Sequence, residues 1–298
     1  VLGELNADMI LTGNNVRPEP NKEKMVDDFE LTLGSSSAIT ACRLAQLGMN
    51  VFFVSVIGAD MLGRYCLERL NDFGVHTEYV TIDNKAKSGV TVSLSSSEDR
   101  SLLTYMGTIN QVTPKHIPET LWEEADHLHF GSFYLQEQMK PLWHNVFQKA
   151  QAQGITTSFD TGWDPREQWD RQMIDRLLEY TNLFIPSETE IQHIYGEQPL
   201  PSSRGDVIIK EGKNGARFVD STGAKTRKRA YHVQAIDTTG AGDSFNAGAI
   251  AAFLEGKRPN ELLDFANACG AISVQHIGGT GGSLRKEDVS RFMAETSK

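Results

Sequence analysis

The chain has 298 residues, of which 39% are hydrophobic and 23% charged, and this composition is typical of a globular protein that buries a large core. Its formal net charge of −10 argues against nucleic acid or an anionic membrane as the main partner, although a pocket can still be locally positive for a small anion. No apolar run approaches the roughly 18 residues that span a bilayer, and no signal peptide is visible, so we expect a cytoplasmic protein.

The predicted elements alternate between helix and strand. Residues 35–48 carry apolar side chains at helical spacing and stop at a glycine, and residues 61–74 repeat this design. Between them, residues 50–58 form a near-continuous apolar run, which is typical of a strand buried on both faces. Further strand-like runs follow at 127–135, 155–160, 182–187 and 206–212. This alternation predicts an α/β fold with a central, mostly parallel sheet and helices on both faces.

Two segments interrupt the alternation. Residues 88–97 place Val90, Val92 and Leu94 on one face of a strand and hydroxyl residues on the other, and a second strand follows a polar turn at 97–100. We predict that segments at about 11–33 and 88–108 form a small β-sheet lid, inserted into a single domain that spans residues 1–298. A surface hairpin without a role is the alternative. The half-exposed, apolar face of such a lid favours a homodimer through the lid.

Histidine and cysteine give weak signals. His127 and His129 would point to the same side of a strand and could hold a metal, but a packed or solvated pair is the commoner outcome. Cys42, Cys66 and Cys269 show no CxxC spacing, which indicates buried free thiols in a reducing compartment. The sequence also lacks the GxxxxGK[ST] motif of P-loop enzymes.

The most informative segment is DTTGAGDSF, residues 237–245, which follows a strand-like run at 230–236 and begins an apolar helix. At the N-terminus of a helix the first backbone N–H groups lack internal partners, and the helix dipole is positive. The bare Gly240-Ala241-Gly242 backbone lets an anion approach closely, so we predict a phosphate-sized hole lined by the N–H groups of Ala241, Gly242 and Asp243. Asp243 is also an ordinary residue for the first turn of a helix.

This segment resembles the second signature of the ribokinase-like (PfkB) family of carbohydrate kinases, DTTGAGDxFxxG, which is complete here through Gly248. The resemblance extends over nearly the whole chain. It includes NAD at 6–8, the first family signature at 34–74, PSETE at 186–190 in place of NxxE, IIKEGKNGA at 208–216 and FANACGAISV at 265–274. The resemblance implies an ATP-dependent kinase that phosphorylates a hydroxyl of a free sugar or sugar acid and needs Mg²⁺.

The resemblance also implies residue roles on the acceptor side. Asp243 would take the proton from the acceptor hydroxyl, while the backbone of Gly240, Ala241 and Gly242 would hold the transferring phosphoryl group. The implied contacts to the small-molecule acceptor come from Asn6, Asp8, Gly34, Ser35 and Asp243.

Cofactor roles follow from the resemblance in the same way. The implied contacts to ATP come from Ser187, Lys210, Gly212, Gly215 and Asn267. Glu190 would hold Mg²⁺ through water, and Asp237 with Thr239 would match the positions that bind K⁺ in some members. The alternative for Asp237 is a cap on its own turn. Arg166 is equally a candidate for phosphate and an ordinary surface residue.

Several positions depart from the family pattern. Ser35 replaces the second glycine of the first signature and Ile39 replaces its asparagine, so the acceptor need not be ribose. Ser187 replaces the asparagine of NxxE, Asp160-Thr161-Gly162 lacks the asparagine of DxN, and Lys210-Glu211-Gly212 replaces Thr-Leu-Gly.

Two other functions stay open. One is a nucleoside kinase with Phe130, Phe133 and Tyr134 around the acceptor base, and the other is a non-catalytic sugar sensor.

Overall fold

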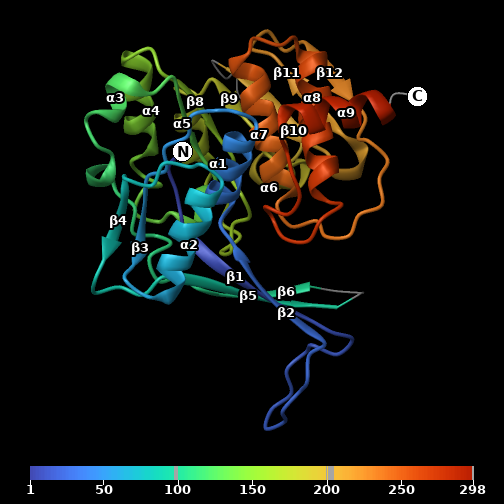
Figure 1. Cartoon of the computed structure of the whole chain (residues 1–298). Helices are drawn as coiled ribbons and strands as arrows, with labels where there is room; N and C mark the ends of the chain where they lie inside the picture. Colours follow the sequence, from blue (N-terminus) through green and yellow to red (C-terminus); the bar gives the residue numbers. More distant parts are fainter. Residues whose placement is uncertain (97–99, 199, 201–204, 297–298) are drawn as a thin grey trace.

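The computed structural model describes residues 1–96, 100–198, 200 and 205–296, and helices alternate with strands as the sequence predicts (Figure 1). The strands in these residues are β1 (Asn6–Thr12), β2 (Asp28–Leu33), β3 (Ser55–Gly58), β4 (Val80–Asp83), β5 (Gly89–Ser95), β6 (Arg100–Tyr105), β7 (His127–Phe130), β8 (Thr156–Phe159), β9 (Leu183–Phe184), β10 (Asp206–Lys210), β11 (Ala216–Val219) and β12 (Lys225–Lys228). The α-helices are α1 (Ser36–Gln46), α2 (Met61–Asp72), α3 (Leu121–Glu124), α4 (Trp143–Ala152), α5 (Arg171–Leu178), α6 (Glu188–Tyr195), α7 (Ala241–Leu254), α8 (Pro259–Ser273) and α9 (Lys286–Thr296).

The central sheet of the described residues has the strand order β12-β11-β10-β9-β8-β7. Strands β7 to β10 run parallel, and β11 and β12 add an antiparallel edge. Beyond β7 the sheet continues through the chain start, because the Leu2 N–H donates to His129 O at 2.8 Å and the Gly3 N–H donates to Val54 O at 3.1 Å. The predicted α/β fold with a mostly parallel sheet is therefore confirmed.

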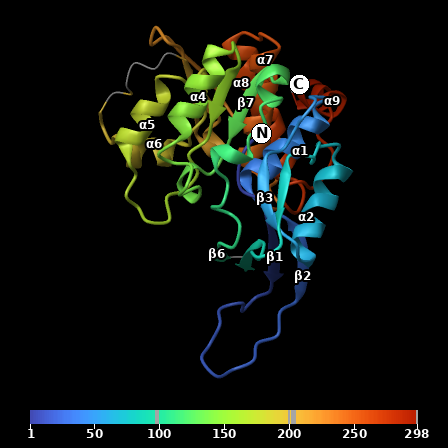
Figure 2. The ribbon, with the colours of Figure 1, turned by 90° about the vertical axis from the view of Figure 1, so that its left-hand side faces the viewer.

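Helices cover both faces of this sheet. One buried cluster joins residues of α1, α2, α7 and α8, and a second joins residues of α4, α5 and α6. Figure 2 shows α4, α5 and α6 on one side of the molecule and α1, α2 and α9 on the other. Helix α7 is buried from Ser244 to Ala252 and packs between α1 and α8, so its N-terminus is fixed from two sides.

Four other strands form a lid sheet with the order β2-β1-β5-β6, which projects from the body of the molecule (Figure 1), and β3 and β4 pair separately in parallel. The lid sheet starts at Asn6, because β1 is itself one of its central strands. The register places Val92 beside Leu103 on one face and Thr91 beside Thr104 on the other. The predicted apolar and hydroxyl faces are thus present, whereas most of the turn predicted at 97–100 lies outside the described residues.

One predicted strand is wrong. Residues 230–236, which we expected to be a strand, belong to no strand or helix. At its end, the Ile236 N–H donates to Val274 O after α8 at 2.7 Å, and the Asp237 N–H that follows donates to the same oxygen at 3.2 Å, so the segment ends on a helix terminus and not on a neighbouring strand. All three cysteines are buried free thiols, as predicted. Among the described residues, no helix combines the length and the apolar character that crossing a membrane requires.

Candidate active site

The N-terminus of α7 is shaped to receive an anion. Gly240 precedes the helix with φ 72°, and a Cβ atom there would lie 2.4 Å from the Cα of Gly279, so only glycine fits. The Ala241 N–H donates to Thr238 O at 3.3 Å. In the described part of the chain, the N–H groups of Gly242 and Asp243 have no protein acceptor. Two donors at the positive end of a helix are therefore available to a phosphoryl group.

Asp243 lies beside these donors, and its side chain is partly buried. The Ser36 hydroxyl at the start of α1 donates to its Oδ1 atom at 2.5 Å. Burial raises the pKa of Asp243 from 3.8 to about 7, the Ser36 hydrogen bond and Lys210 oppose this rise, and the charges of Asp160 and Glu4 add to it. A carboxyl group with this pKa can accept a proton near neutral pH.

A buried ionic cluster lies between Asp243 and the carboxyl edge of the sheet. Lys210, the last residue of β10, donates from Nζ to Asp160 Oδ2 and to Asn246 Oδ1, the latter at 3.1 Å. Asn246, one turn after Asp243 on α7, donates to Asp160 Oδ2 at 2.6 Å. Burial by itself lowers the pKa of Lys210, but the carboxylates of Asp160, Glu190 and Asp243 outweigh it and raise that pKa, so the lysine stays charged.

A cavity of about 580 Å³ opens beside the same helix terminus. It is lined by the predicted nucleotide residues Lys210, Gly212, Gly215 and Asn267, together with Ala241 and Gly242 of the predicted anion hole and apolar residues of α8. The cavity therefore combines an apolar wall for a flat base, free N–H donors and lysine cations for phosphates, a donor set that fits a nucleoside triphosphate. Ser187 does not line it, because its hydroxyl caps α6.

The predicted metal residues have protein partners of their own. Glu190 Oε2 accepts the Ser187 N–H at 2.7 Å and the Thr161 hydroxyl at 3.0 Å, and burial followed by the nearby Asp160 charge raises the Glu190 pKa. Within the described residues, no three His, Cys, Asp or Glu side chains converge as a metal cage. Mg²⁺ commonly keeps waters and uses one or two carboxylates plus substrate phosphates, so Glu190 and Asp160 fit that ion.

The predicted K⁺ residues tie two loops together. Asp237 Oδ1 accepts the Thr239 N–H at 2.9 Å and the Thr239 hydroxyl at 2.7 Å, and Oδ2 accepts the Gly278 N–H at 2.9 Å. Arg43 of α1 fixes the same downstream loop. Its buried guanidinium donates to the backbone oxygens of Gly279, Gly281 and Gly282 at 3.2, 2.6 and 3.1 Å.

The predicted acceptor residues meet at the start of β1 and the end of β2. Asn6 Nδ2 donates to Asp8 Oδ1 at 3.0 Å. A Cβ atom at position 34 would lie 2.2 Å from Asp8 Oδ1 and 2.5 Å from Asn6 Nδ2, so Gly34 leaves the room that these two side chains occupy. Ser35 caps α1, where its Oγ accepts the Ala38 N–H at 3.0 Å and donates to Glu4 O at 2.6 Å.

Sequence reasoning missed four polar residues of this region. Ser36 binds Asp243, Asn246 binds Asp160, and Ser37 donates to the buried carboxylate of Glu4 at 2.7 Å. The run of serines at 35–37 was visible in the sequence. Which serine faces which carboxylate depends on how α1 packs against α7, and no local pattern contains that information.

Several candidates lie away from the site. Phe130, Phe133 and Tyr134 are core residues, and Phe130 stacks on Trp143 at 3.7 Å, so they cannot surround an acceptor base. Ile39 is also buried and lies under Gly279. Arg166 is 61% exposed and pairs with Glu137 at 3.4 Å, as expected of a surface arginine.

The two predicted histidine candidates are hydrogen-bonded within the sheet. His127 binds Thr156 and Ser158 at 2.8 and 2.7 Å, and His129 binds Ser158 at 2.8 Å. Burial lowers the pKa of His127 to about 3 and that of His129 well below its usual range. Both imidazoles are therefore neutral, which fits a packed pair.

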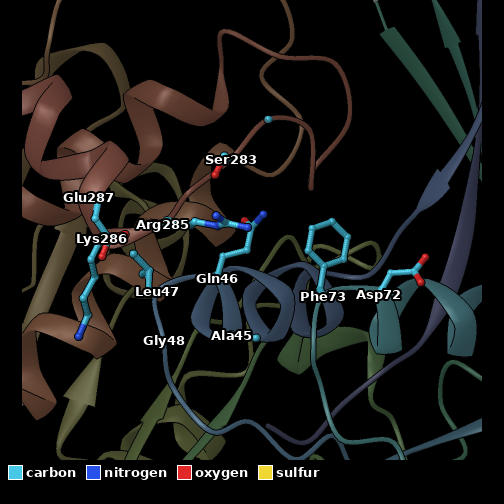
Figure 3. Close-up of a pocket in the computed structure, with 11 residues that line it drawn as sticks. Ala45, Gln46, Leu47, Gly48, Asp72, Phe73, Ser283, Arg285, Lys286 and Glu287 are labelled. Atoms are coloured by element: carbon cyan, nitrogen blue, oxygen red, sulfur yellow. The ribbon is translucent and has the colours of Figure 1, made fainter.

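A second hollow, of about 620 Å³, lies where α1 and α2 end and α9 begins (Figure 3). Its lining includes Gln46, Phe73 and Arg285 and contains none of the predicted site residues. Its lining carries charges of both signs, with Asp72 and Glu287 beside Arg285 and Lys286, whereas the lining of the cavity beside α7 includes two lysines and no carboxylate.

Comparisons with known proteins show the family and the fold of the chain. The model of the pfkB family carbohydrate kinases matches residues 1–286. The chain is 27% identical to a ribokinase of Bacillus subtilis, over 99% of this chain and 98% of that protein, and 27% identical to a 2-dehydro-3-deoxygluconokinase of the same organism, over 90% and 89%. An E. coli protein assigned as ribokinase II and solved with ATP and Mg²⁺ superposes with a TM-score of 0.85 at 22% identity, over 99% of this chain and 98% of that one.

Proposed function

The chain belongs to the pfkB family of carbohydrate kinases, and from this premise we propose that it transfers the γ-phosphoryl group of ATP to a hydroxyl of a free sugar or sugar acid. One observation carries the proposal. A partly buried carboxylate with a raised pKa, Asp243, lies on the same helical turn as two unpaired backbone donors, beside a cavity of nucleotide size. A proton acceptor and an anion hole are thus in contact, which phosphoryl transfer to an alcohol requires.

In the proposed reaction Asp243 accepts the proton of the acceptor hydroxyl as the oxygen attacks phosphorus. The N–H groups of Gly242 and Asp243 and the charged Lys210 hold the phosphoryl oxygens in line. Because the transition state of phosphoryl transfer is loose, positioning and charge stabilisation supply most of the catalysis. Mg²⁺ bound to the phosphates, and held by Glu190 and Asp160 directly or through water, would neutralise charge on the leaving group.

The proposed acceptor lies against Asn6, Asp8, Gly34 and Ser35, between the lid sheet and Asp243. The carboxylate and amide of Asp8 and Asn6 are suited to pair with sugar hydroxyls. Two of the relatives are named as kinases for different acceptors, a sugar and a sugar acid, and these two classes are our candidates. A nucleoside acceptor is disfavoured, because the three aromatic residues that would have held its base are buried in the core.

The test of this proposal is an ADP-release assay with MgATP against pentoses, hexoses, keto-deoxy sugar acids and nucleosides, with and without K⁺. We expect one sugar or sugar acid to be turned over well above the others. A dependence on K⁺ would support a role for Asp237 and Thr239. Binding of a sugar without any ADP release would instead support the sensor function.

We also assign the reaction to the cytoplasm, since three buried free thiols suit a reducing compartment.

The proposed partner, besides the small-molecule substrates, is a second copy of the chain paired through the lid sheets. Phe29, Leu103 and Tyr105 are more than half exposed and share the apolar face of the lid sheet. An exposed apolar sheet face of this kind favours association.

We expect Leu103→Lys to convert a dimer into a monomer, because it places a charge in the centre of the proposed interface. The measurement is the molar mass by light scattering at micromolar concentration. Leu102→Lys is the matched control, because Leu102 points to the opposite, hydroxyl-rich face. A monomeric wild-type protein, or equal dissociation by both variants, would refute the lid interface.

A further inference from the structure

Three consecutive serines at the start of α1 have three different partners. The Ser35 hydroxyl caps the helix, the Ser36 hydroxyl donates to Asp243 Oδ1 at 2.5 Å, and the Ser37 hydroxyl donates to Glu4 Oε2 at 2.7 Å. Two adjacent side chains of the same type thus each bind a carboxylate, that of Asp243 partly buried and that of Glu4 fully buried. Only the Ser36 hydroxyl binds the carboxylate that the proposed reaction uses.

The Ser36 hydrogen bond distinguishes the two oxygens of Asp243. Oδ1 accepts the serine hydroxyl, whereas Oδ2 has no hydrogen-bond donor in the described part of the chain. The backbone of Asp243 is fixed because it belongs to α7, which packs between α1 and α8. With Oδ1 held by α1, the side-chain rotation of Asp243 is restrained as well, which leaves Oδ2 as the oxygen available to an incoming hydroxyl.

We propose that Ser36 is a positioning residue for this kinase, which holds Asp243 by Oδ1 so that Oδ2 receives the proton of the acceptor. This inference rests on the proposed function, since it assigns Asp243 the role of base. A hydrogen bond from a neutral hydroxyl favours the ionised carboxylate over the protonated one. Ser36 therefore also keeps the base in its active form at lower pH than burial alone would allow.

Charged groups on several other elements also shift the pKa of Asp243. Asp160 after β8 and Glu4 before β1 disfavour its ionisation, and Lys210 at the end of β10 favours it. Arg43, two turns further along α1, adds a more distant positive charge. None of these groups changes in a Ser36→Ala variant, so the effect of the hydroxyl can be isolated.

We expect Ser36→Ala to lower kcat/KM at pH 6.5 by about tenfold to a hundredfold, the usual worth of a hydrogen bond to a charged group. The loss should shrink as pH rises, because the acid limb of the pH profile moves to higher pH by about one unit or more. The KM for ATP should stay unchanged. Carbon-13 NMR of the aspartate carboxyl groups, with Asp243 assigned by the Asp243→Asn spectrum, measures the same displacement without turnover.

Ser37→Ala is the matched control, because it removes the neighbouring hydroxyl and orphans a different buried carboxylate. It should lower the thermal midpoint. Because loss of the Ser37 hydroxyl favours a neutral Glu4, whose charge otherwise disfavours ionisation of Asp243, the acid limb should stay in place or move to lower pH, opposite to its displacement in Ser36→Ala. The proposal is overturned if Ser36→Ala keeps the wild-type acid limb, or if both variants move it equally. If the wild-type protein shows no kinase activity, the proposed function fails, while the NMR titration still decides whether Ser36 holds Asp243.

Discussion

Replacing Asp243 by asparagine is expected to lower kcat by about 10²- to 10⁴-fold, the usual contribution of a general base. Asparagine has nearly the same shape and can still accept the Ser36 hydroxyl, so the loss would report the missing proton acceptor. The measurement is ADP release with the best acceptor from the panel, compared with acceptor binding by calorimetry. Binding should persist, and a variant that retains wild-type turnover would show that Asp243 is not the base.

The same Asp243→Asn variant should be more stable than the wild-type protein above neutral pH. In the folded protein the pKa of Asp243 is raised to about 7 from 3.8, so its contribution to stability is present below pH 3.8 and is lost as pH rises to 7. The ionised carboxylate is then buried at a cost that asparagine avoids. The stability advantage of the variant should therefore grow between pH 5 and pH 7 and level off above it.

Thermal midpoints measured from pH 5 to pH 8 test this second expectation. The wild-type and variant curves should converge toward pH 5 and separate toward pH 8. Parallel curves would mean that Asp243 does not titrate in this range, even if the activity result stands. The two results together would identify Asp243 as a residue that favours turnover at the expense of stability.

Replacing Lys210 by methionine is expected to reduce the free energy of unfolding by about 3–5 kcal/mol, since it leaves the buried Asp160 carboxylate without its cation. The side chains of Lys210 and Asp160 are only 13% and 6% exposed, so water cannot take over the role of the lysine. Urea unfolding measures the loss. Lys213→Met is the matched control, because Lys213 lines the same cavity but is exposed, and it should change stability by less than about 0.5 kcal/mol.

A double-mutant cycle separates the contribution of the Lys210–Asp160 ion pair to the free energy of unfolding from a simple loss of packing. Asp160→Asn combined with Lys210→Met removes both charges, and the side-chain oxygen of the new asparagine can still accept the hydrogen bond from the Asn246 amide. The double variant should therefore recover a large part of the lost stability. Equal destabilisation by the single and double variants would show that the unpaired charge of Asp160 does not cause the loss.

The fold was predictable because its signals are local. Apolar runs such as 50–58 and the helical spacing of 61–74 each specify an element without reference to the rest of the chain, and their alternation specifies a parallel sheet. The segment 230–236 shows the limit of this reasoning. Its composition favours a strand, but the N–H of its last residue, Ile236, binds the carboxyl end of α8, and only the assembled structure brings that acceptor close.

The candidate site was predictable where it consists of main-chain groups. The glycines at 34, 240 and 242, with the aspartate at 243, indicate that a ligand can approach the backbone closely. Ser36, Asn246 and Glu4 were missed, because a polar side chain acquires its partner only when distant elements meet. The aromatic residues at 130, 133 and 134 were misplaced for the converse reason, since an aromatic residue after a strand fills a core as readily as a pocket.

Strand β1 gives the molecule a constraint that bears on its evolution and on protein engineering. Its first residues, Asn6 and Asp8, belong to the proposed acceptor site, and its last residues lie far out in the lid sheet. A substitution that changes the tilt of this strand at its outer end must also turn its inner end. Lid positions such as Leu11 and Leu94 are therefore sites at which random libraries can alter acceptor choice without touching a residue that contacts the acceptor.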